Sequence, residues 1–433
     1  MSASKPLISE SNYKKIVVIA ALGYFVDIFD LIIFGIVREQ SLRDLGYSGE
    51  ELMNYGIEIL NWQMAGMLFG GIFWGVIGDK FGRVKVLIFS ILTYSTANIL
   101  NGFVQDVEQY KMLRFIGGIG LAGELGAGVT LAIESMPKNI RGLGGAVIAG
   151  FGVLGAAAAE VIVNMVDWRN AYIIGGSMGL ILMCFRFSMT ESKIFKDHKA
   201  DNAPHGNFLA LFSQRKLVVK YLYCIMIGIP IWFSIGLLTY FSPEFAKELG
   251  VVGTVTAGAA IMWMYIGMAF GDVGSGFVSQ YLKSRKKAVM IFMGLMATVA
   301  YTYTHAHGIT AGQFYALISL LGVGAGYWAL MAINASEQFG VNYRATAATS
   351  VPNFVRASVI PMTLLFKELK PDMGLIEAAM VVGVIVFSLG AFAAWKMQET
   401  FHKDLNFLEG ESEEAGTKRI ADNEEKRNNS KAA

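Results

Sequence analysis

The stretch that decides the fold is Gly75-Val-Ile-Gly-Asp79-Lys80-Phe-Gly82-Arg83-Val-Lys85, a short polar turn between two long apolar runs. A second basic turn, Gly276-Phe-Val-Ser-Gln280-Tyr-Leu-Lys283-Ser-Arg285-Lys286, begins 201 residues later. Another motif repeats at nearly the same offset, since Glu134-x4-Asn139-x-Arg141 recurs 203 residues on as Glu337-x4-Asn342-x-Arg344. Two matching motifs at almost one offset predict an internal duplication, an arrangement typical of transporters built around a midplane site.

Apolar runs occupy most of the 433 residues. The chain is 54% hydrophobic and only 16% charged, whereas an average soluble chain is about 25% charged. Each run is long enough for a helix that crosses a bilayer, which needs ~20 residues. This balance excludes an ordinary soluble enzyme. Twelve spans are expected, near residues 16–38, 55–78, 86–105, 109–135, 143–166, 170–190, 218–243, 255–281, 287–305, 311–338, 345–366 and 374–396.

The longest polar interruption before the tail divides these spans into two sets of six. The predicted fold is an all-α membrane protein of twelve transmembrane helices in two pseudo-symmetric six-helix bundles. Its expected parts are an N-terminal bundle, a cytoplasmic central loop, a C-terminal bundle and a charged cytoplasmic tail, over residues 1–190, 191–217, 218–397 and 398–433.

Orientation follows from the loops, because cytoplasmic loops carry an excess of Lys and Arg. With the N-terminus inside, the cytoplasmic segments hold 25 of these residues and the outer ones hold seven. Both termini are therefore expected in the cytoplasm, in the inner membrane of a bacterium, with the first span retained rather than cleaved. The net charge of +2 predicts no nucleic-acid partner.

The basic turns have a physical purpose beyond orientation. Asp79 can accept hydrogen bonds from the N-terminus of the next helix, Gly82 permits a tight turn, and Lys80 and Arg83 can bind carboxylates or helix C-termini. Such turns can act as breakable latches between bundles, although a plain basic loop is the alternative. The expected latch residues are Gly75, Asp79, Lys80, Gly82, Arg83, Glu134, Arg141, Asp272, Glu337 and Arg344.

These residues resemble a known family. The 75–85 turn is similar to the signature of the major facilitator superfamily, 23–35 resembles the first span of its metabolite:proton symporters, and 114–142 resembles span four of those symporters and of the sugar porters. The resemblance implies transport by alternating access. In two places the chain departs from the pattern: Val84 replaces a usual basic residue, and Gln280 replaces the acidic residue of the second turn, a role that Asp272 can take over.

Charged side chains inside spans are costly, so each is a functional candidate. Asp30 and Arg114 are the expected proton-coupling pair, because protonating the carboxylate would release the guanidinium. The family resemblance supports this pairing, since sugar porters match an acid of span one with the Arg of span four. A static ion pair between the two spans is the alternative. Further proton-coupling candidates are Asp27, Glu124 and Glu160.

Arg356 is the expected substrate residue. No acidic residue is evident at its depth in spans seven to twelve, so its partner is predicted to be a substrate carboxylate, held by two hydrogen bonds. Pairing with Glu124 across the cavity is the alternative. The stretch 351–355, which contains Pro352, predicts a broken or bent helix. Other substrate-site candidates, for which plain packing is the alternative, are Asn353, Tyr327, Trp328, Asn334 and Tyr240.

The predicted function is a proton-coupled symporter that imports a small carboxylate-bearing metabolite, such as an organic acid, an amino acid or a carboxylate siderophore. A proton-driven exporter is the alternative. The sequence shows no nucleotide-binding loop, which argues against an ATP-driven pump. It also shows no output domain, as a sensor would need, and no nucleophile-base set, as an enzyme would need. The expected partners are a small-molecule substrate and the bilayer, with the proton gradient in place of a cofactor, no metal and a monomeric state.

Overall fold

The computed structural model describes residues 10–81, 83–135, 141–186, 208–212, 214–401 and 409. Within those ranges, the side chains of 10–16, 78–83, 125–135, 141–150, 209–210, 341, 342 and 345 are outside the described set.

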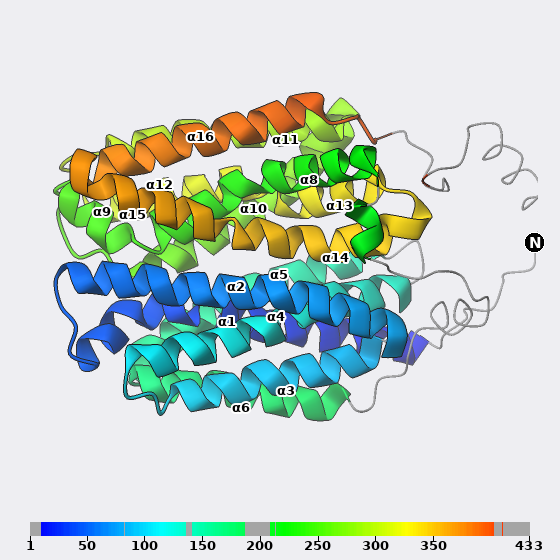
Figure 1. Cartoon of the computed structure of the whole chain (residues 1–433), viewed down its shortest axis with the longest axis horizontal. Coiled ribbons are helices and arrows are strands. Elements are labelled where there is room, and N and C mark those ends of the chain that lie inside the picture. The colour runs from blue at the N-terminus through cyan, green and yellow to red at the C-terminus, as the bar shows by residue number, and fades with distance from the viewer. Residues whose placement is uncertain are drawn as a thin grey trace, which may run out of the picture.

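Six helices form the first bundle (Figure 1). They are α1 (Glu10–Asp44), α2 (Glu50–Phe81), α3 (Arg83–Asn101), α4 (Val107–Ser135), α5 (Arg141–Met165) and α6 (Trp168–Arg186). Each crosses the bundle once, and the connections 45–49 and 102–106 that join them at one end are short.

The second bundle also makes six passes, but three of them are interrupted helices. The elements are α8 (Arg215–Phe233) continued by η2 (Ser234–Thr239) and α9 (Ser242–Glu248), α10 (Ala257–Leu282), α11 (Arg285–Thr304), α12 (Ala311–Ala325) with α13 (Trp328–Gln338), α14 (Val341–Ala357) with α15 (Val359–Met373), and α16 (Leu375–Lys396). A short η1 (Phe208–Phe212) precedes them. The predicted fold of twelve helical passes in two bundles is confirmed. Eight of the described helical segments are long and apolar enough, by length and composition alone, to cross a membrane.

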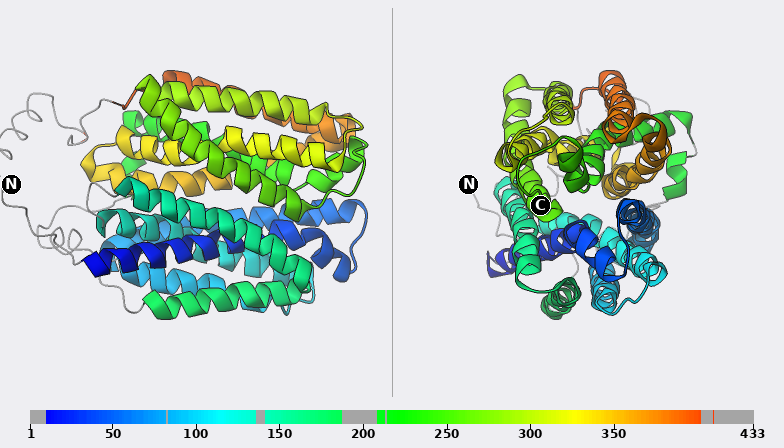
Figure 2. Two further views of the ribbon diagram at one scale, coloured as in Figure 1. Left: turned by 180° about the vertical axis from the view of Figure 1, so that it is seen from behind. Right: turned by 90° about the vertical axis from the view of Figure 1, so that its left-hand side faces the viewer.

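The two bundles lie side by side with their helices running along the same axis (Figures 1 and 2). We call the end at which α1 finishes and α2 begins the distal end, and the opposite end, where α1 begins and α16 finishes, the proximal end. The distal end also contains α9 and the turn between α15 and α16. Functional side chains can thus be placed by their depth between these two ends.

Glycines bring helices into close contact at corresponding places in the two bundles. In the first bundle Gly66 of α2 meets the backbone of Phe115 in α4, and in the second bundle Gly267 of α10 meets the backbone of Ser319 in α12. A Cβ atom at either glycine would overlap a carbonyl oxygen of the facing helix. These contacts fix the spacing of the helix pairs, as small residues do in membrane proteins.

The Gly267 contact gives a stability prediction. Gly267→Ala should lower the free energy of unfolding by about 1–3 kcal/mol, because the added methyl group must push α10 away from rigid backbone rather than from a flexible side chain. Melting of the detergent-purified protein measures the effect. Gly294→Ala in α11 is the matched control, since its Cβ would meet open space. Equal melting temperatures for the two variants would contradict the prediction.

The helix break in the eleventh pass does not lie where the sequence predicts it. Pro352 is inside α14, and the interruption comes at Ser358, between α14 and α15. A proline removes one backbone donor, so the Ala348 carbonyl four residues earlier loses its usual partner, yet α14 continues through Pro352 to Ala357. Ser358 instead ends the helix, since its hydroxyl donates to the Val355 carbonyl at 2.6 Å. The helix is thus not broken at 351–355, and the interruption follows at Ser358; a bend at 351–355, the other form of the expectation, stays a prediction.

Candidate functional site

Arg356 lies near the middle of the eleventh pass, where α14 ends. Its guanidinium faces the rings of Trp232 in α8 and Trp328 in α13, with 5.8 and 5.1 Å from its Cζ atom to the ring centroids. Nη1 donates to the Asn353 side-chain oxygen at 3.2 Å, and the buried Nε has no hydrogen-bond partner. No carboxylate oxygen of the described residues lies within 4.0 Å of this buried cation. The expectation that spans seven to twelve hold no acidic residue at this depth was wrong, because Asp272 of α10 caps α13 next to Trp328.

The first bundle contributes the other side of this site. Tyr24 and Asp27 of α1 lie within electrostatic range of the Arg356 charge, as does Tyr265 of α10 from the second bundle. Asn353 also crosses the interface, because its Nδ2 lies 3.5 Å from the Ala122 carbonyl of α4. Arg356 is therefore at the junction of the two bundles, with aromatic faces from the second bundle and polar groups from both.

Asp30 and Arg114 are neighbours, but they do not form the expected direct ion pair. Arg114 donates to the Asn98 side chain at 3.0 Å and to the backbone carbonyl of Asp30 at 3.1 Å. Both carboxyl oxygens of Asp30 are buried and accept no hydrogen bond from the described residues. The guanidinium is satisfied by neutral acceptors and by the face of Tyr172, 5.5 Å away. Asp30 and Arg114 therefore lie side by side without a direct ion pair.

Glu124 pairs with Arg186 rather than with Arg356. The two guanidinium nitrogens of Arg186 in α6 donate to the two carboxylate oxygens of Glu124 in α4, and both side chains are 2% exposed. Gly23 of α1 packs directly on this pair. Asp27 is the next charged neighbour, and its Oδ1 is buried without a hydrogen-bond partner. Because a nearby guanidinium on α6 occupies Glu124, the alternative pairing with Arg356 is not formed.

Two buried arginines form ion pairs that the sequence analysis does not predict. Arg186 lies inside the predicted span 170–190, so the cost of a buried charge should have marked it. The sequence places Arg38 at the outer end of the first span, whereas α1 continues to Asp44 and Arg38 is 1% exposed. The signal for Arg38 was weak, since its partner Glu244 is more than 200 residues away.

The distal end is closed by polar contacts between the bundles, which we call the distal clamp. Its strongest element is the two-pronged ion pair of Arg38 with Glu244, at 2.7 and 2.9 Å. The other contacts are Tyr240 hydroxyl to Leu31 carbonyl, Thr363 to Asn61, Lys367 to Glu58 and Lys370 to Glu50, at 3.2, 2.8, 3.2 and 3.4 Å. The structure is thus a state in which the distal side of the site is shut.

Other predicted site residues lie away from Arg356. Tyr240 belongs to the distal clamp. Glu160 is half-buried toward the distal end, where it accepts a hydrogen bond from Asn164 and lies against Gly258. Asn334 faces the proximal end, where its Nδ2 donates to the Met397 sulfur and its Oδ1 accepts from Gln338 and Thr400. Tyr327, which precedes Trp328 in the sequence, is buried, and its hydroxyl donates to the Ile227 carbonyl at 3.0 Å. Of the expected substrate residues, only Asn353 and Trp328 contact Arg356.

The first latch lies largely outside the described residues. Gly82 and the side chains of Asp79, Lys80, Arg83, Glu134 and Arg141 are not described, whereas Gly75 lies on α2 with open space beside it. These latch assignments remain predictions.

At the second basic turn, Arg285 pairs with Glu337 at 3.3 Å, and Arg344 donates to the Ser336 carbonyl at 3.1 Å. Glu399, just after α16, accepts hydrogen bonds from Ser284 and from the backbone of Arg285. Burial alone would raise the pKa of Glu399, but these hydrogen bonds outweigh it and hold the pKa below its usual value. Asp272 accepts from the Ala329 backbone at 3.0 Å, so it caps α13 rather than serving the turn.

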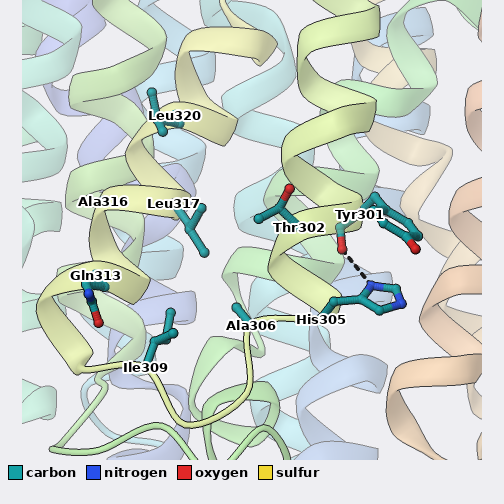
Figure 3. Close-up of a pocket in the computed structure, with 9 residues that line it drawn as sticks. All are labelled: Tyr301, Thr302, His305, Ala306, Ile309, Gln313, Ala316, Leu317 and Leu320. Carbon is teal, nitrogen blue, oxygen red and sulfur yellow. Dashed lines mark hydrogen bonds between the residues drawn. The ribbon is translucent and has the colours of Figure 1, made fainter.

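A separate pocket of about 500 Å³ lies between α11 and α12 (Figure 3). Apolar side chains such as Leu317 and Leu320 form one side, and His305 at its edge bonds to the Tyr301 carbonyl at 2.8 Å. None of the predicted site residues lines it. Among the described residues, no group of three or more His, Cys, Asp or Glu is arranged to hold a metal ion.

Comparison with known proteins decides the family. The sequence model of the Major Facilitator Superfamily matches residues 20–363. The chain belongs to the major facilitator superfamily. This facilitator is 29% identical over 357 residues to a protein of Haemophilus influenzae named as a metabolite transport protein, covering 78% of this chain and 84% of the relative. It is 28% identical over 278 residues to the sialic acid transporter NanX of Escherichia coli, covering 63% and 66%.

Shorter matches, over 36–41% of this facilitator, are to a niacin transporter and a benzoate transport protein of Acinetobacter baylyi and to a 4-hydroxybenzoate transporter of Pseudomonas aeruginosa. Among solved structures, the D-xylose–proton symporter has the same fold, with a TM-score of 0.67 at 17% identity over 91% of this chain and 99% of that one. The protein is therefore a multi-pass membrane transporter of a small molecule and not an enzyme.

Proposed function

We propose that this facilitator is a proton-coupled symporter that imports a small carboxylate-bearing metabolite across the bacterial inner membrane. It works as a monomer, with both termini in the cytoplasm and the distal end facing outward. It takes its energy from the proton gradient, without a cofactor, and binds no nucleic acid. The excess of Lys and Arg in the proximal segments of the sequence supports this orientation.

One observation carries the substrate class: Arg356 is a buried cation at the junction of the bundles, and no carboxylate among the described side chains pairs with it. A guanidinium out of water is costly unless a charged acceptor pairs with it, and its fork matches a carboxylate. Trp232 and Trp328 leave the guanidinium edge to the ligand and offer flat apolar faces beside it. The relatives point the same way, because sialic acid, niacin, benzoate and 4-hydroxybenzoate are all carboxylic acids.

Asp30 supports the proton part of the proposal. It is fully buried, its carboxyl oxygens accept no hydrogen bond from the described side chains or backbone, and Arg114 is held beside it. Loss of a proton would create an anion next to a guanidinium and would draw the two side chains together. Occupancy of Asp30 by a proton therefore changes contacts among α1, α3 and α4, which is how a proton can bias a bundle arrangement.

A matched pair of probes tests the proposed function. In proteoliposomes with an alkaline interior, we expect uptake of nicotinate but not of nicotinamide, which has the same ring with an amide in place of the carboxylate. Sialic acid and 4-hydroxybenzoate complete the panel, and protein-free liposomes correct for diffusion of the neutral acids. Equal uptake of nicotinate and nicotinamide, or uptake of the acids that ignores the pH gradient, would contradict the proposal.

The distal clamp gives a prediction about alternating access. Glu244→Gln should shift the equilibrium toward a distally open state about tenfold or more. The substitution leaves Arg38 buried without its carboxylate in the closed state, so it destabilises that state and not the open one. A difference of about 1.4 kcal/mol changes an equilibrium constant tenfold. Thiol labelling of Thr363→Cys, which lies in the clamp, reports the opening in a Cys184→Ser background.

The control for this measurement is Glu39→Gln, which removes an exposed carboxylate from the ion pair with Arg43 on the same helix. That pair joins no two bundles, so the labelling rate should stay at the unaltered level. The interpretation of the clamp fails if Glu244→Gln labels no faster than Glu39→Gln.

A further inference from the structure

Buried hydrogen-bond donors around Arg356 are left unused by the rest of the described chain. Trp232 is 2% exposed, its ring faces the guanidinium of Arg356, and its Nε1 has no acceptor among the described residues. The Nε of Arg356 is buried and unused in the same way. A buried Trp N–H usually has an acceptor, because a hydrogen bond left unmade out of water is costly. These donors therefore mark a place where a ligand supplies the acceptors.

Two phenol groups belong to the same site. Tyr24 of α1 and Tyr265 of α10 lie within electrostatic range of Arg356 and of each other. Neither phenol hydroxyl forms a hydrogen bond with a described residue. A phenol hydroxyl can both donate and accept a hydrogen bond. Because the two tyrosines come from different bundles, a ligand that bonds to both would also join the bundles.

Carboxylate oxygens add acceptors to this set. The Oδ1 atom of Asp27 is buried without a donor among the described residues, and Asp27 lies within electrostatic range of Tyr24 and Arg356. Asp272, which accepts from the Ala329 backbone at 3.0 Å, is also within electrostatic range of Tyr24. The surroundings of the guanidinium thus combine an indole that only donates, carboxylates that only accept and phenols that do either.

The geometry points to a hydroxylated carboxylic acid as the substrate, with its carboxylate on Arg356 and its hydroxyl groups on Trp232, Tyr24 and Tyr265. This inference rests on the proposed function and narrows it. A hydroxyl group both donates and accepts, so it can pair with an indole N–H, a phenol or a carboxylate. Benzoate offers no second polar group, and nicotinate offers only the acceptor of its ring nitrogen. Trp232 and Tyr265 are therefore specificity-determining residues.

The preference for hydroxyl groups has a direct physical cause. An acid without hydroxyls that binds at Arg356 covers Trp232 and the two tyrosines but leaves their polar groups unpaired out of water. A site that bonds to a substrate hydroxyl rejects the analogue without it for this reason. The loss of affinity is about tenfold for one neutral hydrogen bond. It grows with the number of groups that stay unpaired.

Matched acids test the inference on the purified protein in detergent. Calorimetry compares quinate with cyclohexanecarboxylate, which has the same ring without hydroxyls, and gluconate with hexanoate. Sialic acid is a further hydroxylated acid. We expect at least one hydroxylated acid to bind about 100-fold or more tightly than both deoxy acids, since two or more hydrogen bonds are gained. A zwitterionic probe, 4-aminocyclohexanecarboxylate, should bind no more tightly than cyclohexanecarboxylate.

Two substitutions assign the preference to named groups. Trp232→Phe and Tyr265→Phe each keep an aromatic ring and remove one polar group. Each should lower the affinity for the hydroxylated acid about tenfold and leave that for the deoxy acid unchanged. Tyr281→Phe is the matched control on α10, because the Tyr281 side chain is 87% exposed, and it should keep the full preference. The ratio of two affinities in one variant does not depend on how much of the variant is folded.

The outcomes separate this inference from the proposed function. Equal binding of hydroxylated and deoxy acids, or a preference that neither Trp232→Phe nor Tyr265→Phe reduces, would overturn the inference and leave a carboxylate transporter. Binding of 4-aminocyclohexanecarboxylate more tightly than every hydroxylated acid would also overturn it, in favour of a zwitterionic substrate. Failure of all these acids and of nicotinate to bind or enter would instead contradict the proposed function, and the inference with it.

Discussion

Arg186→Gln is expected to destabilise the protein by about 3–5 kcal/mol, the largest loss of stability that we foresee for a single substitution. The change leaves Glu124 as a buried carboxylate from which its direct cation has been removed, and an uncompensated buried charge has a cost of this size. Melting temperature and monodispersity in detergent should both fall.

A second substitution distinguishes the charge from the packing. The double variant Glu124→Gln/Arg186→Gln should recover much of the lost stability, since two amides of similar volume can bond to each other without a net charge. Arg43→Gln removes an arginine from an exposed pair with Glu39 and should cost only about 0.5 kcal/mol. If the double variant were as unstable as Arg186→Gln alone, the pair would matter for shape rather than for charge.

Arg356→Gln is expected to reduce carboxylate uptake by more than 100-fold. Two charge-assisted hydrogen bonds to the substrate would be lost, at about 1.5–3 kcal/mol each. Arg356→Lys keeps the charge but loses the two-pronged geometry, so its apparent affinity should fall by about 30-fold. Uptake of the nicotinate probe as a function of concentration gives both values.

A stability measurement distinguishes loss of substrate binding from loss of folding in Arg356→Gln. Arg356 forms no direct ion pair with the described residues, so Arg356→Gln leaves no carboxylate without its cation. The free energy of unfolding should stay within about 1 kcal/mol of that of the unaltered protein. Normal uptake by a well-folded Arg356→Gln would remove the main support for a carboxylate substrate. Its contrast with Arg186→Gln separates a cation that binds a ligand from one that holds the scaffold.

The sequence predicts the twelve passes and the two halves because long apolar runs, and basic turns at a fixed offset, are local signals. It also marks Arg356, since a lone cation in a span stands out without knowledge of the fold. Partners across the fold are harder to predict. The pairing of Glu124 with Arg186 and of Arg38 with Glu244 depends on how α4 faces α6 and how α1 faces α9, and neither relation has a signature in sequence spacing.

The predicted pairing of Asp30 with Arg114 is met in position but not in contact. Proximity was predicted from a family resemblance, and the two residues are indeed neighbours. The direct ion pair was not found, because Asn98 and a backbone carbonyl compete for the guanidinium. Which acceptor wins depends on protonation, and a sequence contains no information about the state in which its protein is observed. The proton-coupling role of the pair remains a prediction.

Asn353 lies one helical turn before Arg356. Its side chain packs against Gly71 of α2, and its Nδ2 donates to the Ala122 carbonyl of α4. When the distal clamp opens, the bundles must turn about whatever contact still joins them, so we expect this point to be the fulcrum. The substrate would then be bound almost on the axis of rotation, where displacement is smallest. Arg356 could hold its carboxylate through the whole stroke, while access changes sides around it.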